Sequence, residues 1–188
     1  MKKLLKVILV VVICYCIALV TNLIFLEQIV ISGDSMDENL KNGEFGFADK
    51  QVYKLSGVKR FDIVIVENGG QKIIKRIIGL PNETITYKDG ILLVNGKVVE
   101  EDFISDEEKL NTNRDDLEIS LTLGDNEYYV LGDNRLISYD SRNIGPVNKE
   151  QIKGRLFMIY GYCLDPLFTC DSNDKCDCER RYFWPRFY

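Results

Sequence analysis

The 188-residue chain contains no histidine. This absence excludes the Ser-His-Asp triad, in which an imidazole takes the proton of the serine, and leaves a serine-lysine pair as the simplest serine chemistry. The chain also has no excess of basic residues, since its formal net charge is -5 and its pI about 4.9, which argues against a nucleic-acid-binding surface. No repeat or low-complexity tract is visible, and the length suits one domain or slightly more.

An apolar run, Val7 to Leu26, follows a basic start that contains Lys2, Lys3 and Lys6. As a helix, about twenty residues at roughly 1.5 Å each span about 30 Å, the thickness of a bilayer core. The lysines favour a cytoplasmic N-terminus, so we expect one transmembrane anchor over residues 1–27 with the rest of the chain extracytoplasmic. A cleavable signal peptide is the alternative, but the run is long and no small-x-small cleavage site follows it.

Turn residues between short apolar runs predict two hairpins, Asn68-Gly69-Gly70 between 61–66 and 72–78, and Asn95-Gly96 between 91–94 and 97–99. Residues 128–131 and 156–160 are further β-branched or aromatic runs, whereas the acidic stretch 100–116 predicts an exposed loop with one helical turn. We therefore expect a mostly β fold after the anchor.

The predicted organisation has three parts, of which residues 1–27 are the cytoplasmic start and the transmembrane anchor. Residues 28–160 would form an antiparallel β-sheet catalytic domain, with 82–126 as a small second lobe. Residues 161–188 would form a C-terminal tail rich in cysteine and aromatic residues.

Ser35 lies just beyond the anchor and Lys75 lies in the apolar strand expected at 72–78. Side chains alternate along a strand, so Lys75 shares a face with Ile73 and Ile77. An apolar face disfavours the ammonium form and lowers the pKa of a lysine, which is what a general base near neutral pH needs. The alternatives are an ordinary loop serine and a lysine whose amine reaches water from the strand.

A second polar stretch, rich in Arg, Asp, Asn and Ser, directly follows an apolar strand in the C-terminal half of the chain. Asp140 with Arg142, and Asp133 with Arg135, offer charge-assisted pairs that could fix a buried turn. Ser138 would then be free to hydrogen-bond a neutral amine and orient it.

These segments together resemble the bacterial type I signal peptidases, membrane-bound serine-lysine proteases that remove signal peptides from exported proteins. The matching segments occur in the family's order: Ser32-Gly33-Asp34-Ser35-Met36, Arg60-Phe61-Asp62-Ile63-Val64, Lys75 to Pro81, and Gly132-Asp133-Asn134-Arg135 continuing through Ser138 and Asp140 to Gly145. The single anchor and small second lobe are similar to the Gram-positive type.

The resemblance implies a role for each matching residue. Ser35 would be the nucleophile and Lys75 the general base, Ser138 would orient the lysine amine, and Asp140 and Arg142 would form a supporting pair.

The resemblance also implies a substrate site. The backbone N–H of Ser35 would stabilise the oxyanion, and because Gly33 stands where some relatives carry a serine, the second donor is missing or comes from elsewhere. Ile31, Met36 and Ile74 would line shallow pockets for small side chains, and the substrate would bind as an added strand.

The chain departs from the family's usual pattern at several positions. Glu38-Asn39 replaces a Pro-Thr, Phe61 a frequent Gly, Asn82-Glu83 a Gly-Asp, and Ile137 an Asn. Glu38 has three possible roles: it approaches Lys75 and raises its pKa, it reads a basic residue of the substrate, or it is a solvated loop residue. Glu38 and Asn39 together could narrow the range of precursors that are cleaved or reduce the rate of cleavage.

The cysteines leave alternatives open. Cys14 and Cys16 fit the anchor as apolar filler, whereas the tail cysteines, Cys163, Cys170, Cys176 and Cys178, could form disulfides, remain free or bind a metal. The aromatic and cationic last residues suit either a membrane interface or packing against the β domain.

The leading hypothesis is a membrane-anchored endopeptidase that cleaves precursors after small residues. It needs no cofactor and no catalytic metal, and its expected partners are exported precursors with signal peptides and membrane lipid, not nucleic acid. The alternative is a catalytically weak or idle paralogue that assists the assembly of pilins or surface proteins. A self-cleaving repressor of the serine-lysine type is disfavoured by the anchor and by the lack of a DNA-binding segment.

Overall fold

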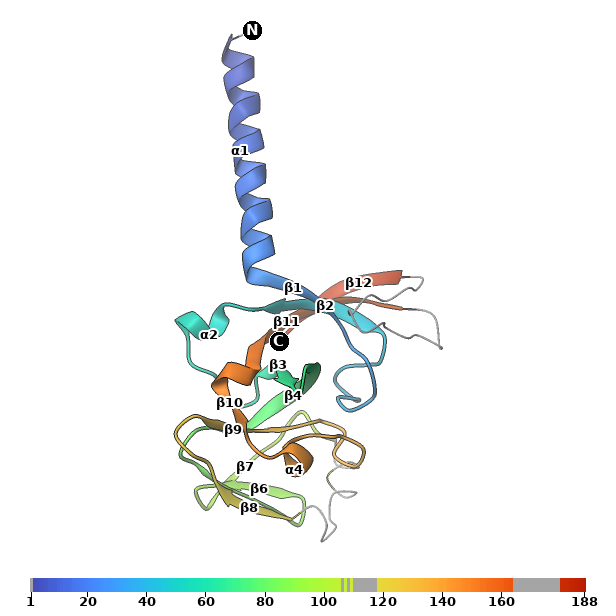
Figure 1. The fold of residues 1–188 in the computed structure, drawn as a ribbon. Helices are drawn as coiled ribbons and strands as arrows, with labels where there is room; N and C mark the ends of the chain where they lie inside the picture. The colour runs from blue at the N-terminus through green and yellow to red at the C-terminus, as the bar shows by residue number, and fades with distance from the viewer. Residues whose placement is uncertain (1, 106, 108, 110–117, 164–179) are drawn as a thin grey trace.

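The computed structural model describes residues 2–105, 107, 109, 118–163 and 180–188, and for residues 2, 17–24 and 180 it describes the backbone alone. A long N-terminal helix, α1 (Lys2–Phe25), stands away from a body built mainly of strands (Figure 1). The side chains of residues 3–16 are exposed. Among the residues that could be assessed, no helix has both the length and the apolar character of a bilayer span.

Two antiparallel sheets form the body, as expected for a mostly β fold. The larger sheet has the strand order β1-β2-β11-β3-β4-β9-β10, with β12 added to β11. Its strands are β1 (Leu26–Val30), β2 (Glu44–Asp49), β3 (Ile63–Asn68), β4 (Gln71–Gly79), β9 (Glu127–Leu131), β10 (Val147–Asn148), β11 (Ile152–Cys163) and β12 (Arg180–Phe187).

The smaller sheet has the order β7-β6-β5-β8 and lies at the end of the molecule remote from α1 (Figure 1). Its strands are β5 (Thr84–Lys88), β6 (Ile91–Val94), β7 (Lys97–Val99) and β8 (Ile119–Thr122). Short helical segments are α2 (Val52–Leu55), α4 (Ser141–Ile144) and the 3-10 turn η2 (Lys149–Gln151). The domain boundaries drawn from the sequence stay a prediction.

Both predicted hairpins are confirmed. Asn68 of β3 pairs with Gln71 of β4 across Gly69 and Gly70, whose φ angles are 58° and 83°. Val94 and Lys97 pair in the same way across Asn95-Gly96, with φ angles of 52° and 76°. Two successive positive φ values are the geometry that matches the twist of paired strands, which is why these turn residues are diagnostic.

The β3 strand is the centre of the larger sheet, and its apolar side chains are buried on both faces. On one face Val64 and Val66 pack with β4 and β9 residues, while on the other Ile63 packs with Leu156 and Ile159 of β11. Ile31, Met36 and Leu40 belong to the same apolar cluster as Ile63. The segment between β1 and β2 is therefore packed on the core.

Two expectations need correction or refinement. The loop predicted to be exposed at 100–116 contains Glu101 and Ile104, each only 4% exposed, because Glu101 is the partner of a buried arginine described below. In the tail, β12 pairs with β11, although Trp184 on it remains 91% exposed. Cys163 is disulfide-bonded, and the other tail cysteines lie outside the described residues.

Candidate active site

The segment 31–43 between β1 and β2, which we call the Ser35 loop, is built around buried apolar side chains that leave Ser35 partly exposed between them. Met36 and Leu40 are 1% and 0% exposed, and Leu40 N–H donates to the Met36 carbonyl at 2.9 Å. This short turn holds the loop on the core and directs Ser35 toward β4.

Lys75 lies on β4 opposite Val64 of β3, and its side chain is only 3% exposed. Its Nζ donates to Ser35 Oγ at 2.6 Å, so the structure brings the two residues into direct contact. Burial lowers the pKa of Lys75 from 10.5 to about 8, although the carboxylates of Asp140 and Asp133 oppose this effect. A lysine with this pKa is about one-tenth neutral at pH 7, enough to serve as a base.

A tightly bonded loop after β9 packs against this pair. The Asp140 carboxylate is fully buried, pairs with the guanidinium of Arg142 at 2.7 Å and accepts from the N–H of Gly132 at 3.0 Å. Arg142 also donates to the carbonyls of Arg135 and Ser138. The predicted pair of Asp140 with Arg142 is therefore present and fixes the path of the loop.

Gly132 is where this loop meets the Ser35 loop. A Cβ at Gly132 would lie 2.2 Å from Ser138 Oγ and 2.4 Å from the Ser35 carbonyl oxygen, far closer than atoms can approach. The N–H of Asn134 donates to the same carbonyl at 3.1 Å. Ser138 Oγ is buried and, within the described part of the chain, has no hydrogen-bond partner, so no bond joins it to Lys75 here.

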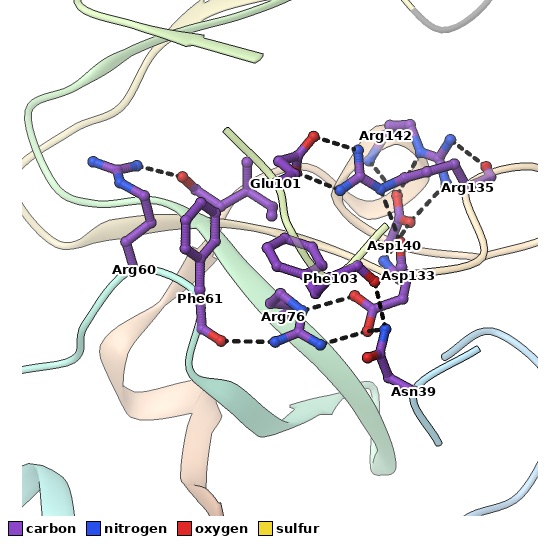
Figure 2. A network of polar contacts seen from close by, with 12 residues as sticks. Asn39, Arg60, Phe61, Arg76, Glu101, Phe103, Asp133, Arg135, Asp140 and Arg142 are labelled. Carbon is purple, nitrogen blue, oxygen red and sulfur yellow. Dashed lines mark hydrogen bonds and ion pairs between the residues drawn. The ribbon is translucent and has the colours of Figure 1, made fainter. Parts of the chain in front are cut away.

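A network of charged side chains includes Arg76, the residue after Lys75 on β4 (Figure 2). Arg76, next to Lys75 on β4, donates to both oxygens of Asp133 at 2.8 and 2.6 Å. Arg135 pairs with Glu101 at 2.5 Å, and both side chains are buried. Asp133 and Arg135, which the sequence suggested as a pair, bond to Arg76 and Glu101, two residues that come from distant segments of the chain.

The Ser35 loop joins this network through two residues that depart from the family's usual pattern. Asn39 Nδ2 donates to Asp133 Oδ2 at 3.0 Å and to the Phe103 carbonyl at 2.7 Å. The Glu38 carboxylate accepts from the N–H and hydroxyl of Ser105 at 3.1 and 2.6 Å. The charges that act on the pKa of Lys75 are those of Asp140, Asp133 and Arg142, so of the three roles considered for Glu38 the approach to Lys75 has no support in the structure.

A cleft of about 620 Å³ opens beside Ser35 and Lys75 between β1 and the first half of β4. The three residues expected to line the substrate site, Ile31, Met36 and Ile74, all line it. β4 pairs with β9 only from Arg76 onward, and β1 is at the edge of the sheet. Each wall therefore presents strand backbone with an open edge, with which an extended peptide could pair.

Sequence reasoning missed Glu101, Phe103 and Ser105 as neighbours of the site. Phe103 lies under the Arg76 guanidinium, 4.0 Å from the ring centroid, and Glu101 neutralises Arg135. These residues fall in an acidic, polar stretch without periodicity, and no local signal distinguishes them.

We expect Gly132→Ala to lower the free energy of unfolding by about 1–3 kcal/mol, because the new methyl group must displace Ser138 or the Ser35 loop. Urea unfolding followed by circular dichroism measures this. Gly57→Ala is the matched control, since a Cβ there meets nothing within 4 Å. Equal stability of the two variants would contradict the tight packing at Gly132.

Lys75→Met should stabilise the protein at pH 7 by about 2–3 kcal/mol. The fall in the pKa of Lys75 from 10.5 to about 8 means that the folded protein holds a buried ammonium at a cost, which methionine removes. Between pH 8 and 10.5 the unfolded lysine binds more protons than the folded one, so wild-type stability should rise with pH and the gap should close. Urea unfolding from pH 7 to 10.5 tests this, with the exposed Lys54→Met as control. A gap that stays constant over this range would contradict the lowered pKa.

Comparison with known proteins identifies the family. The family described as "Signal peptidase, peptidase S26" matches residues 4–161. Signal peptidase I V of Bacillus subtilis (strain 168) is 35% identical over 144 residues, which cover 72% of this chain and 85% of that protein. Signal peptidase I T of the same organism is 39% identical over 155 residues, covering 77% and 78%.

Among solved structures, a signal peptidase I from Enterococcus faecalis V583 has a TM-score of 0.47 and 35% sequence identity, covering 54% of this chain and 97% of that one. The family match and the Bacillus relatives confirm the resemblance drawn from the sequence motifs. The chain belongs to the S26 family of signal peptidases, as a hydrolase of the type I signal peptidase class.

Proposed function

We propose that this chain is a serine endopeptidase that removes signal peptides from exported precursors after small residues, with Ser35 as nucleophile and Lys75 as general base. The observation that carries the proposal is the 2.6 Å hydrogen bond between Lys75 Nζ and Ser35 Oγ at the wall of the cleft. The lowered pKa of Lys75 supports it, because only the neutral amine can take a proton.

The reaction follows from these two groups. Neutral Lys75 takes the hydroxyl proton of Ser35 as Oγ attacks the scissile carbonyl, and the Ser35 N–H stabilises the resulting oxyanion. The Lys75 ammonium then gives its proton to the amine as the scissile C–N bond breaks, which leaves the signal peptide as an ester on Ser35 Oγ. Lys75 next takes a proton from water as the water oxygen attacks the ester, and it returns that proton to Ser35 Oγ as the ester C–O bond breaks, which releases the signal peptide and restores the serine.

Three further residues would support the lysine. The Ser138 hydroxyl, buried beside the Ser35 backbone and unpartnered in the described part of the chain, is free to hydrogen-bond the neutral amine and orient it. Asp140 and Arg142 would hold the loop that carries Ser138, as their ion pair and the bond from Arg142 to the Ser138 carbonyl support.

The substrate would lie extended in the cleft, pairing with the open strand edges of β1 and β4. Ile31, Met36 and Ile74 would form its shallow apolar pockets and favour small side chains near the cleaved bond. Larger side chains would have to displace Ile31 or Met36, which are buried in the core at 2% and 1% exposure.

Residues 1–27 would anchor the protein in the cell membrane, with a cytoplasmic N-terminus and an extracytoplasmic catalytic domain at 28–160. The apolar side chains of α1 from Leu4 to Tyr15 support this, since they are exposed on a helix that stands away from the body (Figure 1). A water-exposed helix surface of this composition is unfavourable, whereas lipid would cover it.

We expect Ser35→Ala and Lys75→Ala to abolish cleavage of precursors by the full-length protein in detergent. Lys75→Arg should be inactive too, because a guanidinium stays protonated, whereas Lys54→Ala should behave as wild type. For the wild type, kcat/KM should rise about tenfold per pH unit below the pKa of about 8 and level off above it.

Gel assays of a panel of exported precursors measure these rates. Near wild-type processing by Lys75→Arg would refute the serine-lysine pair. A folded wild type that binds precursors but cleaves none of the panel would instead favour the idle assembly factor.

The proposed topology has its own test. Protease added outside spheroplasts should digest the chain beyond Glu27 and leave only the anchor, detected with an antibody against an N-terminal tag. Protection of the whole chain, with digestion only after lysis, would reverse the assigned orientation.

A further inference from the structure

Asn39 lies where the Ser35 loop meets the segments that contain Asp133 and Phe103 (Figure 2). Its side-chain amide donates to Asp133 Oδ2 at 3.0 Å and to the Phe103 carbonyl at 2.7 Å, while its own carbonyl accepts from the Tyr188 hydroxyl at 3.3 Å. The side chain is partly buried, so water replaces these bonds less readily than it would at an exposed site. An asparagine amide can donate two hydrogen bonds at once, and here both are used.

The contacts place the Ser35 loop between two other segments. On one side, Asn134 N–H binds the Ser35 carbonyl and Asp133 binds Asn39. On the other, Phe103 binds Asn39, and two residues further on Ser105 binds Glu38 twice. We call residues 101–105 the clamp segment.

The clamp segment is itself held firmly. Glu101 at its start forms the buried pair with Arg135, and the Phe103 ring packs under Arg76 and against Phe61 at 4.9 Å between centroids. A segment fixed at both of these points can hold the Ser35 loop in place.

The backbone at Glu38 explains why the loop needs holding. Its φ angle is 81°, in a region that L residues other than glycine seldom adopt and that costs of order 1 kcal/mol or more. Proline, with φ fixed near -65°, could not occupy this position in this conformation. The hydrogen bonds from Ser105 to the Glu38 carboxylate, and from the Asn39 amide to Phe103 and Asp133, offset that cost and stabilise this conformation of the loop.

We propose that Asn39 is a positioning residue, which joins the Ser35 loop to Asp133 and to the clamp segment and so fixes Ser35 at hydrogen-bond distance from Lys75. The inference rests on the proposed function of Ser35 and Lys75. The cleft is lined by residues 27–33, 35, 36, 65 and 70–75, which leaves Asn39 outside it. Its effect should therefore fall on the reaction step and not on substrate binding.

Asn39→Ala should lower kcat about 10- to 100-fold with KM changed less than threefold, since small displacements of a reacting group cost rates of this size. Asn39→Asp should be at least as impaired, because a carboxylate cannot donate and would face Asp133. Asn39→Thr, with a single hydroxyl donor, should recover part of the rate. Asn126→Ala is the matched control, an exposed asparagine whose Nδ2 also donates to a carboxylate, that of Glu150 at 2.9 Å.

All variants are assayed well below their measured Tm, so that a smaller fraction of folded protein does not lower the apparent kcat. Asn39→Ala with kcat within twofold of wild type, or with KM raised and kcat unchanged, would overturn the proposal. These outcomes differ from failure of the proposed function, in which Ser35→Ala would cleave as fast as wild type or wild type would not cleave.

Hydrogen exchange tests the same junction without turnover. Peptides covering residues 34–40 and 101–105 should exchange faster in Asn39→Ala than in wild type or Asn126→Ala, because the two segments are no longer joined. Unchanged exchange in both peptides would overturn the proposal whatever the activity of the protein.

Discussion

Keeping the amine of Lys75 out of water is the constraint on which the site depends. Burial of the side chain lowers the pKa of Lys75 to about 8, yet Asp140 and Asp133 lie close enough to raise it. Each of these carboxylates is paired with an arginine, Asp140 with Arg142 and Asp133 with Arg76. Because the arginines neutralise the carboxylates, the loss of hydration prevails and the pKa of Lys75 stays low, as its proposed role of general base requires.

Three of the departures from the family's usual residues, Glu38, Phe61 and Asn82, lie at positions with a positive φ angle. Phe61 and Asn82, where glycine is usual, have φ angles of 70° and 66°. Asparagine tolerates such values, whereas Phe61 is held there by bonds from Arg76 to its carbonyl and from its N–H to Ile77. Glu38 takes a φ that proline cannot adopt, and the contact of Ser35 with Lys75 is present with the loop in this conformation.

The parts of the fold that the sequence predicted correctly depend on local patterns. The turns at Gly69-Gly70 and Asn95-Gly96 and the alternation around Lys75 are of this kind. Pairings between distant residues, such as Leu26 with Asp49, left no comparable signal. The burial of Glu101 could not be predicted either, because an acidic residue in an acidic stretch becomes buried only when Arg135 meets it in the folded chain.

A local turn also determines the geometry of the site. The two-residue turn at Gly69-Gly70 sets the register in which Lys75 lies opposite Val64 and Arg76 opposite Ile63. Consecutive strand residues point to opposite faces, so Lys75 reaches Ser35 while Arg76 reaches Asp133, which in turn binds Asn39 of the same loop. A register shift of one residue would exchange the two faces and break both contacts together. The position of Ser35 therefore depends on a turn more than thirty residues away, through two neighbouring side chains of β4.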